Sequence, residues 1–168
     1  MKFLILSFLL TLSAFAASPE DYLAINKKAS KLFVAQNNFS FDSADKEIIQ
    51  KVSKARWDLL KQAKDQNAEA KKLFLDFIKT TKAAKAAPDD KKLKMQVIIS
   101  RNKIDAFLAT NADSQNQFKE LYTPYSEAMN SLDQVKASLF TNEQDKSLYL
   151  EHVEKLKNIR NQNDSQDI

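Results

Sequence analysis

The 168-residue chain contains no glycine at all. Glycine makes up about 7% of average protein sequences, so roughly a dozen would be expected in a chain of this length. Tight β-hairpins, phosphate-binding loops and the nucleophile elbows of hydrolases all depend on glycine at positions that other residues adopt poorly. The absence therefore argues against a β-rich fold and against these catalytic loops. The abundant Ala, Lys, Leu, Gln and Glu favour helices instead.

The first seventeen residues have the pattern of a secretory signal peptide. Lys2 supplies a positive charge, a run of Phe, Leu and Ile follows, and Ala14–Ala16 offers small residues at the two positions that a signal peptidase reads. This apolar run is shorter than a membrane-spanning helix requires, and no later segment is apolar enough to cross a bilayer. We therefore expect residues 1–17 to be removed and the mature protein, extracellular or periplasmic, to begin near Ser18.

About 150 residues remain after the signal peptide, which is enough for one domain with its own apolar core. The whole chain has 26 Lys and Arg against 22 Asp and Glu, a formal net charge of +4, and no cysteine. This is a mixed surface rather than the concentrated basic footprint of a nucleic-acid-binding protein, so we expect no nucleic-acid partner. Without cysteine the protein forms no disulfide and carries no lipid anchor of the bacterial lipoprotein type.

Apolar residues recur at three- and four-residue steps along five segments, which is the pattern of amphipathic helices. These segments cover approximately residues 19–35, 43–86, 90–109, 118–139 and 142–160. The second segment fits either one helix of about forty residues, which we favour, or two helices hinged near Asp65–Asn67. Pro124 interrupts the fourth segment, where the helix either kinks or begins anew with Thr123 as its cap.

Residues that commonly cap helices stand where these segments begin. Ser18 and Thr141 open capping-box patterns, and Asp42 or Ser43 is suited to cap the second segment. Residues 110–117 are rich in Asn, Gln and Ser and are predicted to be a polar connection between helices. Each boundary therefore has local chemistry that suits a helix start or a turn.

Since each helix has only one apolar stripe, the helices must pack against one another. We predict an all-α fold, an up-and-down bundle of four to five amphipathic helices with one very long member. The bundle should occupy residues 18–160, followed by a frayed tail at residues 161–168. No internal repeat or linker divides this region into smaller domains.

The sequence offers little material for catalysis or metal binding. His152 is the only histidine, and we interpret it as a helix-surface residue between Glu151 and Glu154. The usual zinc sites need more His and Cys ligands than this chain contains. Acidic groups in residues 41–47 and 141–146 lack the ligand spacing of an EF-hand loop and suit helix N-termini. We therefore predict no catalytic residue, no metal site, no cofactor and no enzyme activity.

Two groups of apolar residues are candidates for binding. If the middle helices are neighbours, the rings of four phenylalanines converge: Phe74, Phe77, Phe107 and Phe118. These rings would either contact an apolar ligand or form part of the ordinary core. A near-heptad stripe on residues 118–139 offers a face for a protein partner: Tyr122, Tyr125, Met129 and Leu132. This stripe would equally suit an intramolecular core, so no oligomeric state follows from it.

Two surface features depend on what surrounds the protein. Residues 79–94 form the densest basic stretch, which suits contact with anionic lipid or an acidic partner, or else a solvated turn between helices. No aromatic residues interleave with these lysines to stack on nucleic-acid bases. Asn38 and Asn163 stand in glycosylation sequons, which matter only in a eukaryotic source.

Two stretches of the chain resemble the nematode SXP/RAL-2 family of small secreted helical proteins. Asn37–Val52 (NNFSFDSADKEIIQKV) is similar to that family's polar turn at the start of a helix, and Ser131–Leu156 (SLDQVKASLFTNEQDKSLYLEHVEKL) is similar to its later helix, polar turn and closing helix. The resemblance implies a secreted helical protein without established enzyme activity, often described as a cation-binding domain. It assigns no ligand residue in this chain.

Together these features predict a secreted, non-enzymatic helical binding protein. It would hold a small apolar ligand or a protein partner between or along its amphipathic helices. The alternative is an SXP/RAL-2-like secreted protein of unknown activity that binds a divalent cation. A calcium-dependent change in helicity or melting temperature would distinguish the alternative from the first prediction.

Overall fold

The computed structural model describes residues 17–36 and 39–161, and these residues form seven helices and no strand. The all-α class is therefore confirmed, although the number of helices exceeds the predicted four to five. Nearly all of the predicted signal peptide, the two sequon residues Asn38 and Asn163 and most of the predicted tail lie outside the described residues. The helices are α1 (Pro19–Val34), α2 (Ser43–Ala63), α3 (Ala68–Ala86), α4 (Lys91–Thr110), α5 (Ala112–Gln117), α6 (Lys119–Ser138) and α7 (Glu143–Asn161).

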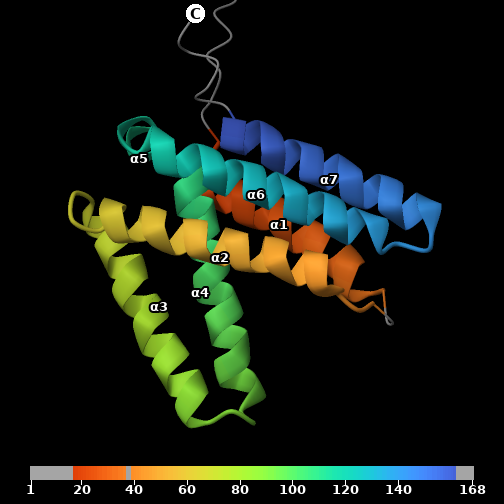
Figure 1. Ribbon diagram of the computed structural model, residues 1–168, viewed down its shortest axis with the longest axis horizontal. Helices are drawn as coiled ribbons and strands as arrows, with labels where there is room; N and C mark the ends of the chain where they lie inside the picture. The colour runs from red at the N-terminus through yellow and green to blue at the C-terminus, as the bar shows by residue number, and fades with distance from the viewer. Residues whose placement is uncertain (1–16, 37–38, 162–168) are drawn as a thin grey trace, which may run out of the picture.

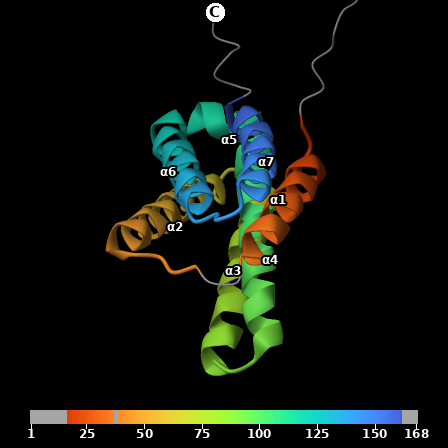
Figure 2. The ribbon, with the colours of Figure 1, turned by 90° about the vertical axis from the view of Figure 1, so that its right-hand side faces the viewer.

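Four long helices, α1, α2, α6 and α7, lie alongside one another, and α2 packs on α6 while α1 packs on α7 (Figure 1). Helices α3 and α4 form a hairpin that projects away from these four helices, as the view turned by 90° also shows (Figure 2). Only the C-terminal half of α4 enters the bundle, where Ile104–Ala109 are buried. We call the projecting part, residues 71–103, the arm.

Residues 43–86 form two helices, so the predicted single long helix is wrong and the hinged alternative is correct. Helix α2 ends at Ala63, and Asn67 adopts an extended backbone before α3 begins. The Asn67 side-chain oxygen accepts hydrogen bonds from the backbone nitrogens of Glu69 and Ala70 at 2.9 and 3.1 Å. This cap satisfies amides at the start of α3 that would otherwise lack partners, and it makes the break favourable.

The substitution Asn67→Ala should lower the free energy of unfolding by about 1 kcal/mol, because it removes this cap. Denaturant unfolding followed by circular dichroism measures the change. The exposed Lys71, in the first turns of the same helix, supplies the control, and Lys71→Ala should change stability by less than about 0.5 kcal/mol. Equal effects of the two substitutions would contradict the capping role of Asn67.

The caps of the other helices agree in part with the sequence patterns. Ser18 and Asp42 each begin a reciprocal capping box, which confirms Ser18 and selects Asp42 over Ser43. Helix α7 is capped by Asn142 rather than by the predicted Thr141. The Asn142 side-chain oxygen accepts from the backbone nitrogens of the second and third helical residues at 2.9 and 3.0 Å, and a cap one residue earlier would place these amides out of register.

Two further boundaries differ from the sequence expectations. Residues 112–117, predicted to be a polar connection, form the short helix α5, because Asn111 accepts from the Ser114 backbone nitrogen at 2.8 Å and Gln115 is buried. Helix α6 runs through Pro124 without restarting, so the alternative of a new helix capped by Thr123 is wrong. Pro124 is only six residues into α6, so one backbone hydrogen bond is lost near the helix start.

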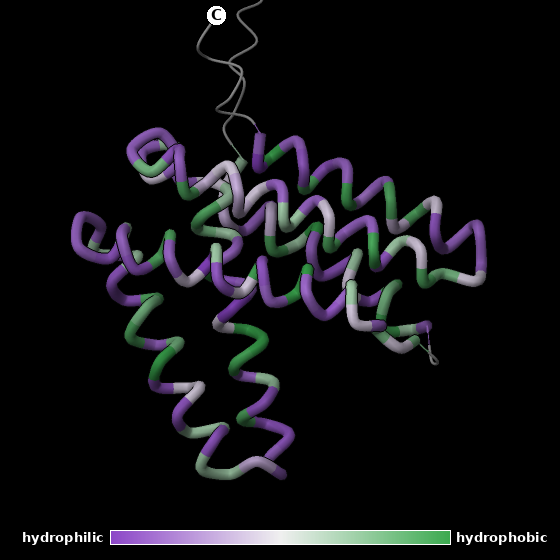
Figure 3. The backbone as a smooth tube through the Cα atoms, viewed as in Figure 1, coloured by the Kyte–Doolittle hydropathy of each residue, from purple (hydrophilic) through white to green (hydrophobic). Residues whose placement is uncertain are grey.

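The apolar core consists of three clusters that join the helices into one body. The largest brings together α2, the C-terminal half of α4 and α6, and it includes Leu59, Leu108 and Tyr125. The second joins α1 to α7 around Phe33 and Tyr149, and the third packs the N-terminal part of α1 against α4 and α7. Apolar residues recur along the helices in Figure 3, and the arm also carries apolar residues outside the bundle.

Candidate functional site

The four phenylalanines predicted to converge all belong to, or pack against, the largest core cluster. Phe107 is buried in the largest cluster, and Phe74, Phe77 and Phe118 are half-buried against it. The ring of Phe74 stacks on Trp57 with centroids 4.9 Å apart, where α3 meets α2. The four residues therefore share one core cluster, in which they contact protein atoms.

The predicted partner face on α6 is used inside the chain. Tyr122, Tyr125 and Met129 are buried, and Leu132 is half-buried against the same cluster. This placement fits the intramolecular-core alternative that the near-heptad stripe left open. The surface of α6 that remains accessible lies on an adjacent face of the helix.

A buried ion pair links α2 to α4, two helices of the largest cluster. The Arg56 guanidinium donates from Nε to Asp105 Oδ1 at 2.6 Å and from Nη2 to Asp105 Oδ2 at 2.9 Å. The Tyr125 hydroxyl donates to the same Oδ1 at 2.7 Å, so a residue of α6 joins the pair. Arg56 and Asp105 are only 7% and 5% exposed. Three helices are thus held in one register by charge-assisted hydrogen bonds.

A second buried ion pair links α6 to the last turn of α7. Arg160 is 1% exposed and donates from Nη2 to Asp133 and to Asn130, both at 2.8 Å. The Tyr122 hydroxyl donates to the Arg160 backbone carbonyl at 2.7 Å. Tyr22 of α1 is also buried near this guanidinium. The C-terminal helix is therefore fastened by polar contacts in addition to its apolar stripe.

These polar groups act on the protonation of the neighbouring side chains. Burial on its own would lower the pKa of both buried arginines. Asp105 raises the pKa of Arg56, and Tyr22 and Asp133 raise the pKa of Arg160. Both guanidinium groups therefore stay charged. Burial raises the pKa of Tyr22, Tyr125 and Tyr149, and the nearby carboxylates raise it further.

The protein should lose stability in alkali, because these three buried phenols keep their protons while tyrosines of the unfolded chain ionise near pH 10. The folded state then binds more protons, so stability is complete below about pH 9 and falls as pH rises. At pH 10.5 each tyrosine should remove ~0.8 kcal/mol from the free energy of unfolding, measured against pH 8 by denaturant titration. In Tyr149→Phe this alkaline loss should shrink by ~0.8 kcal/mol. An unchanged loss would contradict the assignment.

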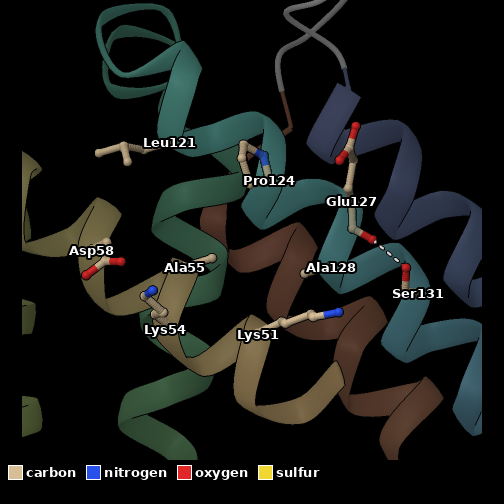
Figure 4. A pocket seen from close by; sticks show the side chains of 9 residues that line it. All are labelled: Lys51, Lys54, Ala55, Asp58, Leu121, Pro124, Glu127, Ala128 and Ser131. Carbon is tan, nitrogen blue, oxygen red and sulfur yellow. Dashed lines mark hydrogen bonds between the residues drawn. The ribbon is translucent and has the colours of Figure 1, made fainter. Parts of the chain in front are cut away.

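An open groove of about 470 Å³ lies between α2 and α6 (Figure 4). Helix α2 supplies Lys51, Lys54, Ala55 and Asp58 at helical spacing, and α6 supplies Leu121, Pro124, Glu127, Ala128 and Ser131. The small side chains of the two alanines leave the space between the helices open. We call this feature the α2–α6 groove.

The α2–α6 groove combines an apolar surface with charged edges. Ala55, Leu121, Pro124 and Ala128 provide its apolar contacts. Two lysines of α2, Lys51 and Lys54, and two acidic residues, Asp58 and Glu127, place charges of both signs around it. Lys51 forms an exposed ion pair with Glu47 at 3.1 Å, which is weak in water and leaves the ammonium accessible. The site therefore suits a mainly apolar molecule with a charged group at one end.

A smaller cavity of about 190 Å³ lies where the arm meets the bundle. Its lining includes Trp57 and Phe77, which are aromatic, and the guanidinium groups of Arg56 and Arg101. Burial lowers the pKa of Arg101, and the neighbouring Arg56 lowers it further. Phe77 is the one member of the predicted phenylalanine group that lines either cavity.

The remaining sequence candidates occupy ordinary positions. His152 is half-buried on α7, and the described residues contain no group of three or more His, Cys, Asp or Glu side chains placed to hold a metal ion. Among the helices of the described residues, none combines the length and apolar character needed to span a membrane. The basic stretch of residues 79–94 spans the end of α3, the turn and the start of α4, at the tip of the arm.

No family model, no curated protein and no solved structure matches this chain. The resemblance to the SXP/RAL-2 family therefore stays a prediction.

Proposed function

We propose that the protein is an exported, non-enzymatic helical binding protein that holds a small, mainly apolar ligand in the α2–α6 groove. The observation that carries the proposal is the groove itself, whose volume of about 470 Å³ falls within the range typical of small-molecule sites. The accessible surface of its lining is mostly apolar, as is usual for such sites, although five of the nine lining residues are polar or charged. The signal-peptide pattern of residues 1–17 supports the proposed export.

The two lysines at the edge of the groove define the chemistry of the ligand more closely. Lys51 and Lys54 lie one helical turn apart and face the same space. An anionic group at one end of an apolar ligand would pair with these ammonium groups while the apolar part contacts Leu121 and Pro124. The proposed ligand is therefore amphipathic, with a mass of a few hundred daltons.

Anilinonaphthalene sulfonate, which joins apolar rings to a sulfonate, is a suitable probe of this site. Its fluorescence should rise and saturate on titration with the chain from Ser18 onward. Ser131→Phe, which places a ring in the groove, and the double charge reversal Lys51→Glu with Lys54→Glu should each weaken binding at least about tenfold.

Matched controls distinguish the groove from the rest of the surface. Ser138→Phe changes another exposed serine of α6 whose hydroxyl also donates to a backbone carbonyl of its own helix. Lys27→Glu with Lys28→Glu reverses two exposed lysines of α1. Both controls should bind the probe as the unchanged chain does. Absence of saturable binding, or equal losses in the controls, would overturn the proposal.

The divalent-cation alternative rests on the family resemblance alone. It predicts that millimolar calcium raises the melting temperature of the protein, and an unchanged melting temperature would remove it.

A further inference from the structure

The arm carries a charge that differs strongly from that of the rest of the protein. Residues 71–103 contain nine Lys, one Arg and three Asp, a net charge of +7, whereas the whole chain has a net charge of +4. The remainder of the chain is therefore net negative. Because the arm projects from the bundle (Figures 1 and 2), its positive field is presented away from the acidic part of the molecule.

Helix α4 also has an exposed apolar stripe within the arm. Met95, Ile98 and Ile99 are 55%, 45% and 47% exposed, and their three- and four-residue steps place them on one face. The opposite side of α4 faces α3, where Thr80 donates a hydrogen bond to Ser100 at 3.4 Å. These three side chains therefore point away from the partner helix of the hairpin.

The exposed stripe is the continuation of a stripe that is buried further along α4. Ala106 and Ala109 lie on the same face, about two to four turns later, and pack against residues of α1 and α7. Toward the tip of the arm, the large apolar side chains Met95, Ile98 and Ile99 take the place of these alanines and remain exposed. This part of the α4 surface is therefore apolar although no other helix of the described structure covers it.

Basic residues flank the apolar stripe on both sides. Helical spacing places Lys94 and Arg101 on one side and Lys92 and Lys103 on the other, and all four are exposed. An apolar strip between rows of cations is the pattern of helices that lie in the boundary between lipid headgroups and acyl chains. The arm has this pattern on a helix that is already folded and held in place by α3.

The composition of this surface fits a lipid bilayer better than a protein partner. Protein interfaces are enriched in aromatic residues and Arg and depleted in Lys. The arm has nine Lys to one Arg, and its most exposed apolar side chains are aliphatic. Lysines attract anionic lipid headgroups without needing a fixed partner geometry.

We propose that the arm docks on an anionic membrane surface, with Met95, Ile98 and Ile99 entering the headgroup region and the flanking lysines pairing with lipid phosphates. This is a second binding surface, since no residue that lines the α2–α6 groove belongs to the arm. Its failure would leave the ligand proposal for the groove untouched.

Sedimentation with vesicles tests this proposal on the chain from Ser18 onward. Vesicles of phosphatidylcholine with about one third phosphatidylglycerol should bind the protein, vesicles of pure phosphatidylcholine should not, and added salt should release it. The triple variant Lys91→Gln, Lys92→Gln, Lys94→Gln should weaken binding about a hundredfold. The double variant Ile98→Gln, Ile99→Gln should weaken it at least about tenfold.

Controls of the same chemistry lie elsewhere on the surface. Lys27→Gln, Lys28→Gln, Lys31→Gln removes three exposed charges from α1, and Leu148→Gln removes an exposed apolar side chain from α7. These variants should retain binding to within about threefold. All substituted residues are exposed, so circular dichroism should show unchanged folding. The proposal is overturned if the unchanged chain does not bind the anionic vesicles. Binding to polyglutamate, an acidic polypeptide, without binding to the vesicles would have the same consequence. The proposal is also overturned if the α1 triple variant loses as much binding as the arm triple variant.

Discussion

Replacing Asp105 by alanine should lower the free energy of unfolding by about 3–5 kcal/mol. The substitution leaves the Arg56 guanidinium buried without its bidentate partner, and it removes the acceptor of the Tyr125 hydroxyl. A buried charge without a partner is far more costly than the pair is favourable, because its desolvation is no longer compensated. Urea unfolding of the unchanged chain and of Asp105→Ala, followed by circular dichroism, measures the difference.

A triple variant separates the penalty of an unpaired charge from the net value of the pair. Arg56→Met, Asp105→Leu, Tyr125→Phe removes all three polar groups and fills the space with apolar atoms. Its stability should return to within about 2 kcal/mol of the unchanged chain. If Asp105→Ala lost less than about 1 kcal/mol, the buried pair would not exist as described.

Replacing Arg160 by methionine should also remove about 3–5 kcal/mol, because buried Asp133 then loses its hydrogen-bonded cation and Asn130 loses a donor. The substitution should destabilise α7 most, because the guanidinium of Arg160 links the last turn of this helix to α6. Thermal unfolding followed by circular dichroism measures the shift in melting temperature. Denaturant unfolding at the same pH measures the change in the free energy of unfolding.

An exposed ion pair on the same helix provides the control for Arg160. Lys155 and Glu151 lie 2.6 Å apart on the surface of α7, with about half of each side chain exposed. Lys155→Met should cost less than about 1 kcal/mol, since exposed pairs contribute little. Comparable losses for Arg160→Met and Lys155→Met would contradict a special role for the buried pair.

The helical class and several helix starts followed from local chemistry. The absence of glycine excluded hairpins, and Ser18 and Asp42 cap helices because their side chains reach amides only a few residues away. The break between α2 and α3 at Asn67 was harder to predict, because the apolar periodicity continues weakly through it. The cap formed by Asn67 makes two separate helices more favourable than one bent helix. Such a choice depends on how α2 and α3 pack, which a periodic pattern does not specify.

The buried charges escaped the sequence reading because their partners are distant along the chain. Arg56 and Asp105 are separated by 49 residues, and Asp133 and Arg160 by 27. Each looks like a surface residue in a sequence, since Arg and Asp are mostly exposed. A usable signal was that all four stand beside or within apolar stripes of their helices, where a charged residue needs a partner.

The candidate groove was missed for a related reason. The predicted partner face on α6 contains Tyr122, Tyr125 and Met129, and the core of the protein buries these large side chains. The groove uses the neighbouring face, with Pro124, Ala128 and Ser131, whose small side chains gave no strong pattern. A cavity arises where small residues of two helices meet, and this depends on the pairing of α2 with α6 rather than on either sequence alone.

The most direct test of the proposed ligand site is a native mass spectrum of the chain from Ser18 onward, purified without denaturation from a host that secretes it. We expect an adduct of a few hundred daltons that is lost on denaturation. The adduct should also be missing from Ser131→Phe and present on Ser138→Phe when these are purified in the same way. A protein without an adduct, or an adduct retained by Ser131→Phe, would contradict binding in the α2–α6 groove.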